Sequence, residues 1–358
     1  MLSRKFISVS KIYIARLFIL NILISGCSKS AKVEEEPFIF KTDTVTVLNT
    51  PGSPVKPRDG DFTIIGLPDT QYYLAQPQLG GVAEMFSAQI AWIKNNQVAE
   101  NIVYVAHLGD VSDHGDNVMY AHAEWYPAKT IMYGLENPVS IPYGIAVGNH
   151  DQFPSQYPVT GTTLNYNKNF GVPHFTGRPY YGGHYGSNND SHYDLFSAGG
   201  LDFIVIYIEF DVFNQDQSNM NTWAYNLLNS YSSRKAIIVS HYLIGNNDSP
   251  GTNAGIPGTF RTQGQGIYDR LKYCPNVFMM VCGHVGDNGE GYRKDTFQGN
   301  TIRTFLSDYQ SRENGGNGLM RLYSLSVENN KIDIKTFSPY TNTYETDGDS
   351  QFTTPLFD

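Results

Sequence analysis

The sequence predicts an α/β domain built on buried, mixed β-sheets, and three observations on its apolar pattern lead to this fold class. The first is a series of near-continuous apolar runs, which are typical of strands that are covered on both faces. These runs lie at residues 62–69, 101–110, 141–151, 201–210, 235–241 and 276–284. They predict six strands in the core of the domain.

The second observation is that helical patterns lie between the strand-like runs. Between the first two runs, apolar side chains recur at the spacing of one helix face. These side chains are Val82, Met85, Phe86, Ile90 and Ile93. Residues 219–231 and 266–273 are further helix candidates. The alternation of strands and helices is typical of an α/β sheet.

The third observation is a change to strand patterns alone after residue 284, in "EGYRKDTF", "TIRTFLSDY", "LMRLYSLSVE" and "KIDIKTFS". The whole chain has 358 residues, of which 41% are apolar and 16% are charged. This composition suits one large core better than two small ones. We therefore expect residues 61–358 to form one mixed-sheet α/β domain that closes into a single sandwich.

The first 27 residues are typical of an exported protein. A basic start is followed by an apolar run at 17–24, which is short for a membrane span, and by small residues. Cys27 comes next, as in a bacterial lipobox, so we predict a signal peptide at 1–26, lipidation of Cys27 and a tether at 27–60. An ordinary signal peptide with a chance cysteine is the alternative. The lipid-anchored interpretation places the protein on a membrane of the cell envelope, outside the cytoplasm.

Charge and cysteine content exclude two classes of protein. Removal of residues 1–26 takes four basic residues and no acidic ones, which leaves 25 − 4 = 21 Lys and Arg against 34 Asp and Glu. This balance argues against a stable nucleic-acid partner. Cys274 and Cys282 flank a predicted strand that would hold them more than ~20 Å apart. That separation is too large for a disulfide, so a disulfide framework is excluded.

Groups that can bind a metal ion follow five of the predicted strands, at the edge where open α/β sheets place their sites. Each group would otherwise need its own buried partner, so their coincidence favours one shared site. Carboxylates, an amide and imidazoles suit Mn, Fe or Zn, and the lack of cysteine argues against a structural zinc site. The candidates are Asp69, Asp110, Asp113, Asn149, His150, Asp151, His241 and His284.

The order of the motifs "PDTQ", "GDVSD", "GNHD", "SHY" and "CGHVG" resembles that of the calcineurin-like metallophosphoesterases, over residues 61–310. The "PDTQYY" and "SDYQ" segments look like one bacterial lipoprotein branch of that family. The resemblance implies a four-layer sandwich of two mixed β-sheets flanked by helices. It also implies a monomer that hydrolyses a small phosphomonoester or phosphodiester, with a nucleotide, a sugar phosphate and a lipid-linked phosphate all left open.

Carried over residue by residue, the resemblance implies two divalent metal ions, of Mn, Fe, Zn or Mg, that activate a hydroxide. Asp110 would bridge both ions, and Asp69 would serve the first with Gln71 at the usual histidine position. The second ion is assigned to Asn149, His241 and His284. His150 would assist the leaving group rather than bind metal, with Asp113 orienting its ring.

Two positions depart from the family pattern, and both concern the first metal. Gln71 stands in place of a histidine, and an amide is a weaker donor to Zn than imidazole. Gly286 stands at the second histidine of "GHxH" and offers no ligand. The residues that could complete this half of the site are Asp287, Glu290, His107 and Asp308.

Residues 152–196 show little regular pattern, and loops of this length are commonly functional. They are predicted either to wall the metals, with Arg178 or His184 binding substrate, or to form a surface flap of stacked tyrosines. The rival to an enzyme is a surface binding lipoprotein with a degenerate, single-metal or metal-free site. The intact "GNHD" and Asp113 favour the enzyme, because a decaying site would lose its proton donor. A third possibility is one tightly held metal and a second that arrives with substrate.

Overall fold

The computed structural model describes residues 52–54, 57–75, 80–154, 161–211, 215–246, 257–286 and 288–358. Residues Thr50–Asp358 form one compact unit. The predicted signal peptide, Cys27 and most of the predicted tether lie outside the described residues. None of the helices in the described part of the chain has the length and apolar character that a membrane crossing requires.

The first large sheet holds the amino-terminal strands of the domain. Its parallel part consists of β2 (Phe62–Leu67), β3 (Ile102–His107) and β5 (Tyr143–Ile145). The strands β13 (Met320–Ser326), β14 (Lys331–Ser338), β15 (Thr343–Glu345) and β16 (Gln351–Pro355) extend it in antiparallel fashion. The order is β15-β14-β13-β2-β3-β5, with β16 paired to β14. The chain therefore returns from its far end to complete the sheet on which it began.

The second large sheet has the order β11-β12-β10-β9-β8-β7-β6. Its central strands are parallel, namely β8 (Leu201–Ile208), β9 (Lys235–Ser240), β10 (Val277–Cys282) and β12 (Asn300–Ser307). Its antiparallel strands are β6 (Tyr181–His184), β7 (His192–Ala198) and β11 (Glu290–Phe297). A separate short parallel pair joins β1 (Ser53–Pro54) to β4 (Val139–Ser140). Both large sheets are thus mixed.

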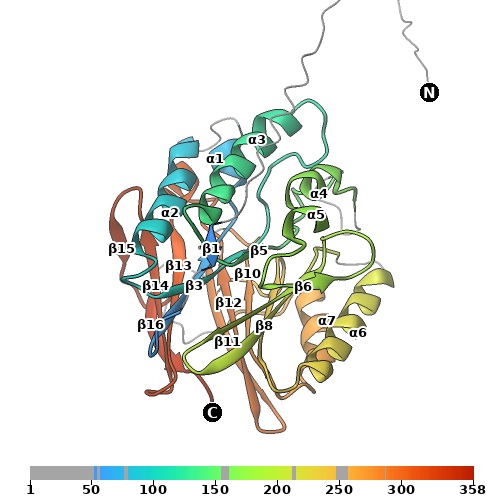
Figure 1. The fold of residues 1–358 in the computed structure, drawn as a ribbon, viewed down its shortest axis with the longest axis vertical. Coiled ribbons are helices and arrows are strands. Elements are labelled where there is room, and N and C mark those ends of the chain that lie inside the picture. Colours follow the sequence, from blue (N-terminus) through green and yellow to red (C-terminus); the bar gives the residue numbers. More distant parts are fainter. Residues whose placement is uncertain are drawn as a thin grey trace, which may run out of the picture. The chain divides into compact units, whose positions relative to one another are not determined.

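Helices cover the outer face of each sheet, as Figure 1 shows for α2 and α3 on one side and for α6 and α7 on the other. The first group comprises α1 (Gln71–Leu74), α2 (Ala83–Asn96), α3 (Ala121–Met132), α4 (Leu164–Phe170) and α5 (Val172–Phe175). The second comprises α6 (Gln215–Ser230) and α7 (Thr262–Leu271), and short 3-10 helices lie at Tyr133–Glu136 and Glu313–Gly316.

Three hydrophobic clusters separate four layers of structure. One lies between the first helix group and the first sheet, and includes Phe86 and Val105. The middle cluster joins the inner faces of the two sheets through residues such as Phe62 and Phe203. The third joins the second sheet to α6 and α7, through Ile238 among others. Apolar side chains therefore cover both faces of each sheet, which explains the continuous apolar runs of the central strands.

The predicted fold class and all six predicted core strands are confirmed, with observed ends that stop before the polar residues that follow them. The description of residues 152–196 as poor in regular structure is wrong. The described residues of that range contain α4, α5, β6 and the first five residues of β7. Short helices and the glycine-rich strand "YGGH" carry too few apolar residues for a clear period. They form because they pack against longer neighbours.

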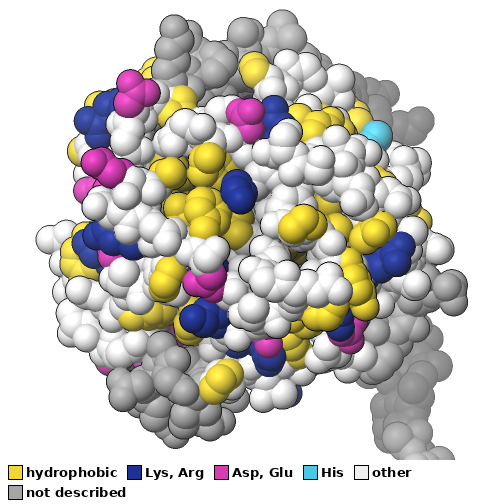
Figure 2. All heavy atoms as spheres, turned by 90° about the horizontal axis from the view of Figure 1, so that it is seen from below, with side chains coloured by type: hydrophobic (Ala, Val, Ile, Leu, Met, Phe, Trp, Pro, Cys, Tyr) yellow, Lys and Arg dark blue, Asp and Glu magenta, His cyan; other side chains and the backbone are white. Residues whose placement is uncertain are grey.

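The surface at the lower end of Figure 1 is mixed in character. On the face that Figure 2 shows, Lys and Arg of the described residues are scattered among Asp and Glu, and hydrophobic side chains form several separate groups. A cavity of 280 Å³ is lined by residues that include Lys235, Phe278 and Asp358. Lys235 is the first residue of β9, so this cavity lies at the opposite sheet edge from the residues that follow the strands.

Candidate metal centre

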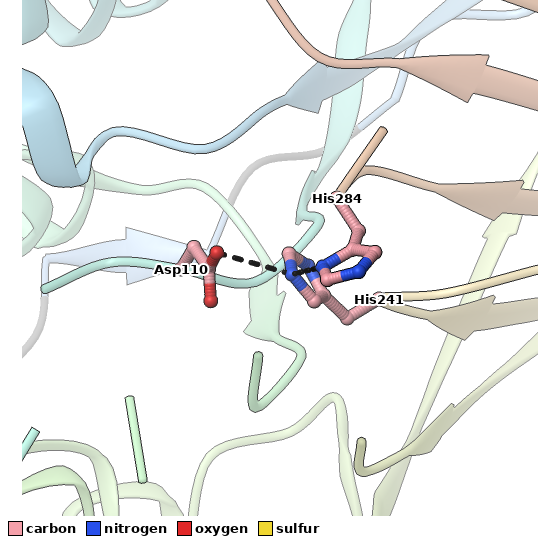
Figure 3. A group of neighbouring side chains, drawn as sticks. All are labelled: Asp110, His241 and His284. Atoms are coloured by element: carbon pink, nitrogen blue, oxygen red, sulfur yellow. Dashed lines mark hydrogen bonds and ion pairs between the residues drawn. The ribbon is translucent and has the colours of Figure 1, made fainter. Parts of the chain in front are cut away.

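The polar residues that follow five core strands come together at one place. Asp110 follows β3, His241 follows β9 and His284 follows β10, and each offers a ligand atom within 4.8 Å of the other two. Figure 3 shows the two imidazoles and the carboxylate turned toward one another. His241 Nε2 lies 3.2 Å from Asp110 Oδ2 and 3.1 Å from His284 Nδ1. Asn149, which follows β5, brings its Oδ1 to 3.1 Å from His241 Nε2.

The backbone at these strand ends is held in an unusual conformation. Asp69, Asp110 and His284 have φ angles of 27°, 53° and 73°. All other non-glycine residues with positive φ in the described part of the chain are Asn, apart from Gln298. Positive φ is uncommon for residues other than glycine, and Asn, Asp and His adopt it more often than the others. Three such positions at neighbouring strand ends show that the chain turns sharply at each of them.

Glycines next to these residues let backbone and carboxylate approach closely. A Cβ atom at Gly148 would lie 2.1 Å from Asp110 Oδ1, and one at Gly283 would lie 2.2 Å from Asp69 Oδ2. Both distances are far inside van der Waals contact, so neither position accepts a side chain. The glycines before Asn149 and His284 are therefore needed for the packing of the carboxylates.

The tautomer of His241 leaves its second nitrogen for the centre. Its Nδ1 donates a hydrogen bond to the carbonyl oxygen of Leu108 at 2.9 Å. The opposite nitrogen, Nε2, then faces Asp110 Oδ2 and Asn149 Oδ1, which are both acceptors. Burial opposes a charge on this ring, but Asp110 outweighs burial and raises the pKa of His241. Without a metal, a proton on His241 Nε2 satisfies these two acceptors. A metal ion bound to Nε2 and to the two oxygens would take the place of that proton.

The charges of the centre fit a cation. Burial, followed by repulsion from Asp308 and Asp110, raises the pKa of Asp69 well above its usual range. Burial alone would raise the pKa of Asp110, but His241 and the neighbouring histidines lower it. Burial together with His241 lowers the pKa of His284 to about 3, so that ring is neutral and keeps a lone pair for a metal. A divalent ion among these groups would relieve the carboxylate repulsion.

Gln71 lies in the centre as the sequence predicted, at the start of α1. Its Nε2 donates to Asp110 Oδ2 at 3.2 Å and contacts Gln310 Oε1. Its Oε1 is buried and has no hydrogen-bond partner among the described residues. Amide oxygens are ligands for hard divalent cations, so this atom is a candidate ligand. Sequence reasoning missed Gln310, although the "SDYQ" segment that contains it had been noticed.

His150 and Asp113 contact each other as expected. His150 Nδ1 lies 2.9 Å from Asp113 Oδ1 and donates to the Asp113 carbonyl oxygen at 3.0 Å, and its backbone N–H donates to Asp110 Oδ1 at 2.9 Å. Burial lowers the pKa of His150, but Asp110 and Asp113 outweigh it and raise the pKa to about 10. The Asp113 backbone N–H is held by Glu124 Oε2 at 2.8 Å, a contact from α3 that sequence reasoning missed.

Two further candidates from the sequence hold the loops rather than face the centre. Asp151 accepts hydrogen bonds from the backbone N–H groups of Val111, Ser112 and Gly148 at 2.9–3.0 Å. It therefore ties the loop after β3 to the loop after β5. His107 bonds Thr70 Oγ1 at 3.0 Å through Nε2 and accepts from the Gly109 N–H at 3.3 Å through Nδ1. Both of its nitrogens are engaged, so His107 is a hydrogen-bonded strand histidine and does not complete the first metal site.

Of the other residues predicted to complete the first metal site, Glu290 is engaged elsewhere. Its carboxylate pairs with Arg321 Nη2 at 3.0 Å and with Arg312 Nη2 at 3.4 Å, which neutralises it. Asp287 lies outside the described residues. Asp308 is fully buried, and its charge acts on Asp69. Asp308 is therefore the candidate of this set that the structure brings toward the centre.

The predicted substrate residues lie in other surroundings. Arg178 forms a buried ion pair with Glu136 at 2.9 Å, and its Nη2 lies 3.0 Å from His174 Nε2. This pair belongs to the aromatic packing of the first helix group, where Tyr133 stacks on His174. The contacts of Arg178 with Glu136 and His174 therefore give this side chain a structural role. The predicted contact with substrate is not what the structure shows for Arg178. His184 is half-buried on β6, the outermost strand of the second sheet, and its role in substrate binding stays a prediction.

Comparison with known families decides what kind of centre this is. The family model described as calcineurin-like phosphoesterase matches residues 62–288, which is more than half of the chain and contains every residue of the centre up to His284. The chain belongs to the calcineurin-like phosphoesterase family. The resemblance seen in the motifs is thereby confirmed at the level of the family, and a metal centre at Asp110, His241 and His284 accords with it.

One solved structure supports the fold, and further proteins are similar to this chain. The structure of purple acid phosphatase PPD1 from yellow lupin (Lupinus luteus) matches with a TM-score of 0.50 and 15% identity, over 85% of this chain and 55% of that one. A dimetal phosphatase from Danio rerio matches with a TM-score of 0.46 and 14% identity, over 83% and 100%. The uncharacterized protein YvnB of Bacillus subtilis (strain 168) is 31% identical over 309 residues. That match covers 82% of this chain but 21% of YvnB, so the chain spans about one fifth of that relative's length.

Proposed function

We propose that this protein hydrolyses a phosphomonoester or a phosphodiester with two divalent cations held by Asp69, Gln71, Asp110, Asn149, His241 and His284. The observation that carries the proposal is the position of Asp110. Its Oδ2 lies 3.2 Å from both His241 Nε2 and Gln71 Nε2, so one carboxylate touches both halves of the ligand set. Family membership supports the same chemistry.

The bound ions would polarise the phosphate oxygens and lower the pKa of a water molecule, which turns it into a nucleophile at neutral pH. The chain itself supplies the proton for the leaving group. The contacts of the His150 ring to Asp113 go through Nδ1, which leaves the Nε2 side of the ring for a substrate oxygen. Asp113 orients the ring, and Glu124 holds the backbone of Asp113 and His114. Such an arrangement suits general acid catalysis.

The test uses the full-length protein, stripped with a chelator and reloaded with Mn, Fe, Zn or Mg. Hydrolysis of an aryl phosphate and of an aryl phosphodiester is measured with each ion. We expect activity on one of the two esters, and a fall in kcat of about 100-fold or more for His150→Ala, the range that general acids contribute. His122→Ala is the matched control, since His122 is exposed on α3.

Two outcomes would overturn the proposal. One is the absence of hydrolysis with every ion, which would favour the rival function of a surface binding protein. The other is equal activity of His150→Ala and the unmodified protein. Two further measurements show how many ions the protein holds. Activity that rises in proportion to added Mn would favour one held ion and a second that arrives with substrate. Two ions that remain bound after dialysis would rule this out.

We also propose that Cys27 anchors the protein to a membrane of the cell envelope. The proposal rests on the residue pattern of the first 27 residues, which ends in "ISGC". We expect the mature protein in the membrane fraction and Cys27→Ser in the soluble extracytoplasmic fraction. Membrane association that is unchanged by this substitution would contradict lipidation at Cys27.

A further inference from the structure

The Asp69 half of the centre departs from the family pattern at Gly286, which carries no side chain. A Cβ atom at position 286 would lie 2.1 Å from Ser311 Oγ and 3.7 Å from Asp308 Oδ2. The space into which a side chain at 286 would extend is therefore filled by the segment 308–311. This segment follows β12.

The strand pairing explains why this segment reaches the centre. β10 and β12 are parallel neighbours, and Cys282 pairs with Leu306. His284 and Asp308 each lie two residues beyond that pair. Since parallel neighbours end at the same sheet edge, the register places Asp308 beside His284. The sequence separation between the two residues hides this relation from any local motif.

Hydrogen bonds connect Asp308 to the residues of the centre. Asp308 is fully buried, and its two carboxylate oxygens accept bonds from the backbone N–H and the Nε2 of Gln310, both at 3.0 Å. Gln310 Oε1 contacts Gln71 Nε2, which itself lies 3.2 Å from Asp110 Oδ2. The result is a continuous chain of polar contacts from Asp110 to Asp308.

A second observation indicates a ligand at this place. Gln71 is fully buried, yet its Oε1 has no hydrogen-bond partner in the part of the chain that the structure describes. A buried amide oxygen without a partner carries a substantial desolvation cost. The nitrogen of the same amide group contacts Asp110 and Gln310, and this holds the group beside the carboxylates. A cation bound to Oε1 would satisfy it.

We propose that Asp308 replaces the histidine missing at position 286 and joins Asp69, Gln71 and Asp110 in an all-oxygen site for a hard divalent cation. Gln310 is a positioning residue that holds Gln71 and Asp308. Carboxylate and amide oxygens select Mg²⁺ or Mn²⁺, whereas the two imidazoles of the other half favour Zn²⁺ or Fe²⁺. The two halves thus take ions of different chemistry. The proposal rests on the metal-dependent function above and assigns the ion class of each half.

The first experiment counts ions without measuring hydrolysis. The full-length protein is stripped with a chelator, offered Mn²⁺ and Zn²⁺ together, freed of excess and analysed for bound metal. We expect one Mn and one Zn per chain. Asp308→Asn should keep the zinc and lose the manganese, with at least a tenfold rise in the Mn²⁺ dissociation constant measured by electron paramagnetic resonance. Asp349→Asn, a buried aspartate outside the centre, should bind both ions as before.

Thermal unfolding separates loss of a ligand from loss of the fold. In chelator, Asp308→Asn should melt no lower than the unmodified protein, because it removes one of several neighbouring buried carboxylates. Its rise in Tm on addition of Mn²⁺ should disappear, since an ion that does not bind cannot stabilise. Gln71→His is the second variant. It places an imidazole in the all-oxygen site, so this site should bind zinc in place of manganese.

Four results would overturn the Asp308 site or separate it from the proposed function. Asp308→Asn that still binds manganese with unchanged affinity overturns it, and so does Gln71→His with an unchanged ratio of Mn to Zn. If Asp308→Asn does not fold, the Gln71→His ratio gives the answer. A chain that binds manganese through Asp308 but hydrolyses neither aryl ester refutes the proposed function and supports this site. An active chain whose Asp308→Asn variant keeps both ions refutes this site alone.

Discussion

Two groups of acidic residues in the described part of the chain differ in the charges that surround them. Asp69, Asp110 and Asp308 are buried at the candidate metal centre and repel one another, and Asp69 and Asp110 form ion pairs with His241. Glu290 lies at the start of β11, between Arg321 and Arg312. Burial and neighbouring acids raise the pKa of Asp69. Burial would also raise the pKa of Glu290, but the two arginines lower it.

Proximity of carboxylates alone does not distinguish the two places. Glu290, Asp347 and Asp349 offer ligand atoms within 4.8 Å of one another, as Asp110, His241 and His284 do. The Glu290 carboxylate is paired with two positively charged side chains of the same protein, Arg321 and Arg312. Among the described residues, the carboxylates Asp69 and Asp110 of the candidate centre form ion pairs with a histidine and not with an arginine, so a cation from solution would balance their charge. A buried acid paired with arginine is thus neutralised within the chain, whereas buried acids beside one another favour a bound cation.

The largest effect is expected from removing the internal cation of the Glu290 group. Arg321→Met leaves a buried carboxylate half-paired, and breaking a buried ion pair in this way costs about 3–5 kcal/mol of unfolding free energy. Urea denaturation measures the loss. The double variant with Glu290→Met should regain much of it, because an apolar pair replaces the charges. A single variant as stable as the unmodified protein would show that Arg321 does not neutralise Glu290.

Removal of metal should have the next largest effect and should act on the other group. A divalent ion present at 100 times its dissociation constant stabilises the fold by about 2.7 kcal/mol, so chelation should lower Tm and added Mn²⁺ should restore it. The Tm of Asp347→Asn should respond to chelation as that of the unmodified protein does, since arginines neutralise the Glu290 group and no metal ion is expected there. A Tm that does not change on chelation would contradict a bound ion in the folded protein.

The pH dependence of stability should reveal the lowered pKa of Glu290. A carboxyl whose folded pKa lies below its unfolded value stabilises the fold above that unfolded value, and this stability is lost as the pH falls through the folded pKa. Glu290→Gln should therefore be less stable than the unmodified protein at pH 7, and the difference should shrink toward pH 3. Denaturation at several pH values measures it. A difference that is constant with pH would exclude this linkage.

The smallest effect is expected for Asp347→Asn. Asp347 is exposed, and its Oδ1 accepts one hydrogen bond from the Ser350 N–H at 3.0 Å. Since an asparagine Oδ1 can accept the same bond, the substitution should cost less than about 0.5–1.5 kcal/mol, the usual net value of such a bond. Metal analysis should find the same ions as before. Fewer bound ions would show that the Glu290 group binds metal after all.

The residue pattern predicted much of the fold and of the centre. Continuous apolar runs marked the core strands, and Asp69, Asp110, Asn149, His241 and His284 were found because each lies at or near the end of such a run. Local patterns work here because burial of a parallel strand requires apolar side chains on both faces. The polar residues after these strands are close in space wherever the strands are neighbours.

The sequence by itself thus determined the fold class, the family and the candidate ligands at the ends of the predicted strands. Only the tertiary structure decided how the remaining acids and arginines are used. Asp308 reaches the centre through the register of β12 with β10, and Glu290 is neutralised by Arg321, a residue 31 positions away. Pairing between distant strands sets these contacts. Residue type and local spacing do not encode that register, so the surroundings of Asp308 and Glu290 could be read only from the folded chain.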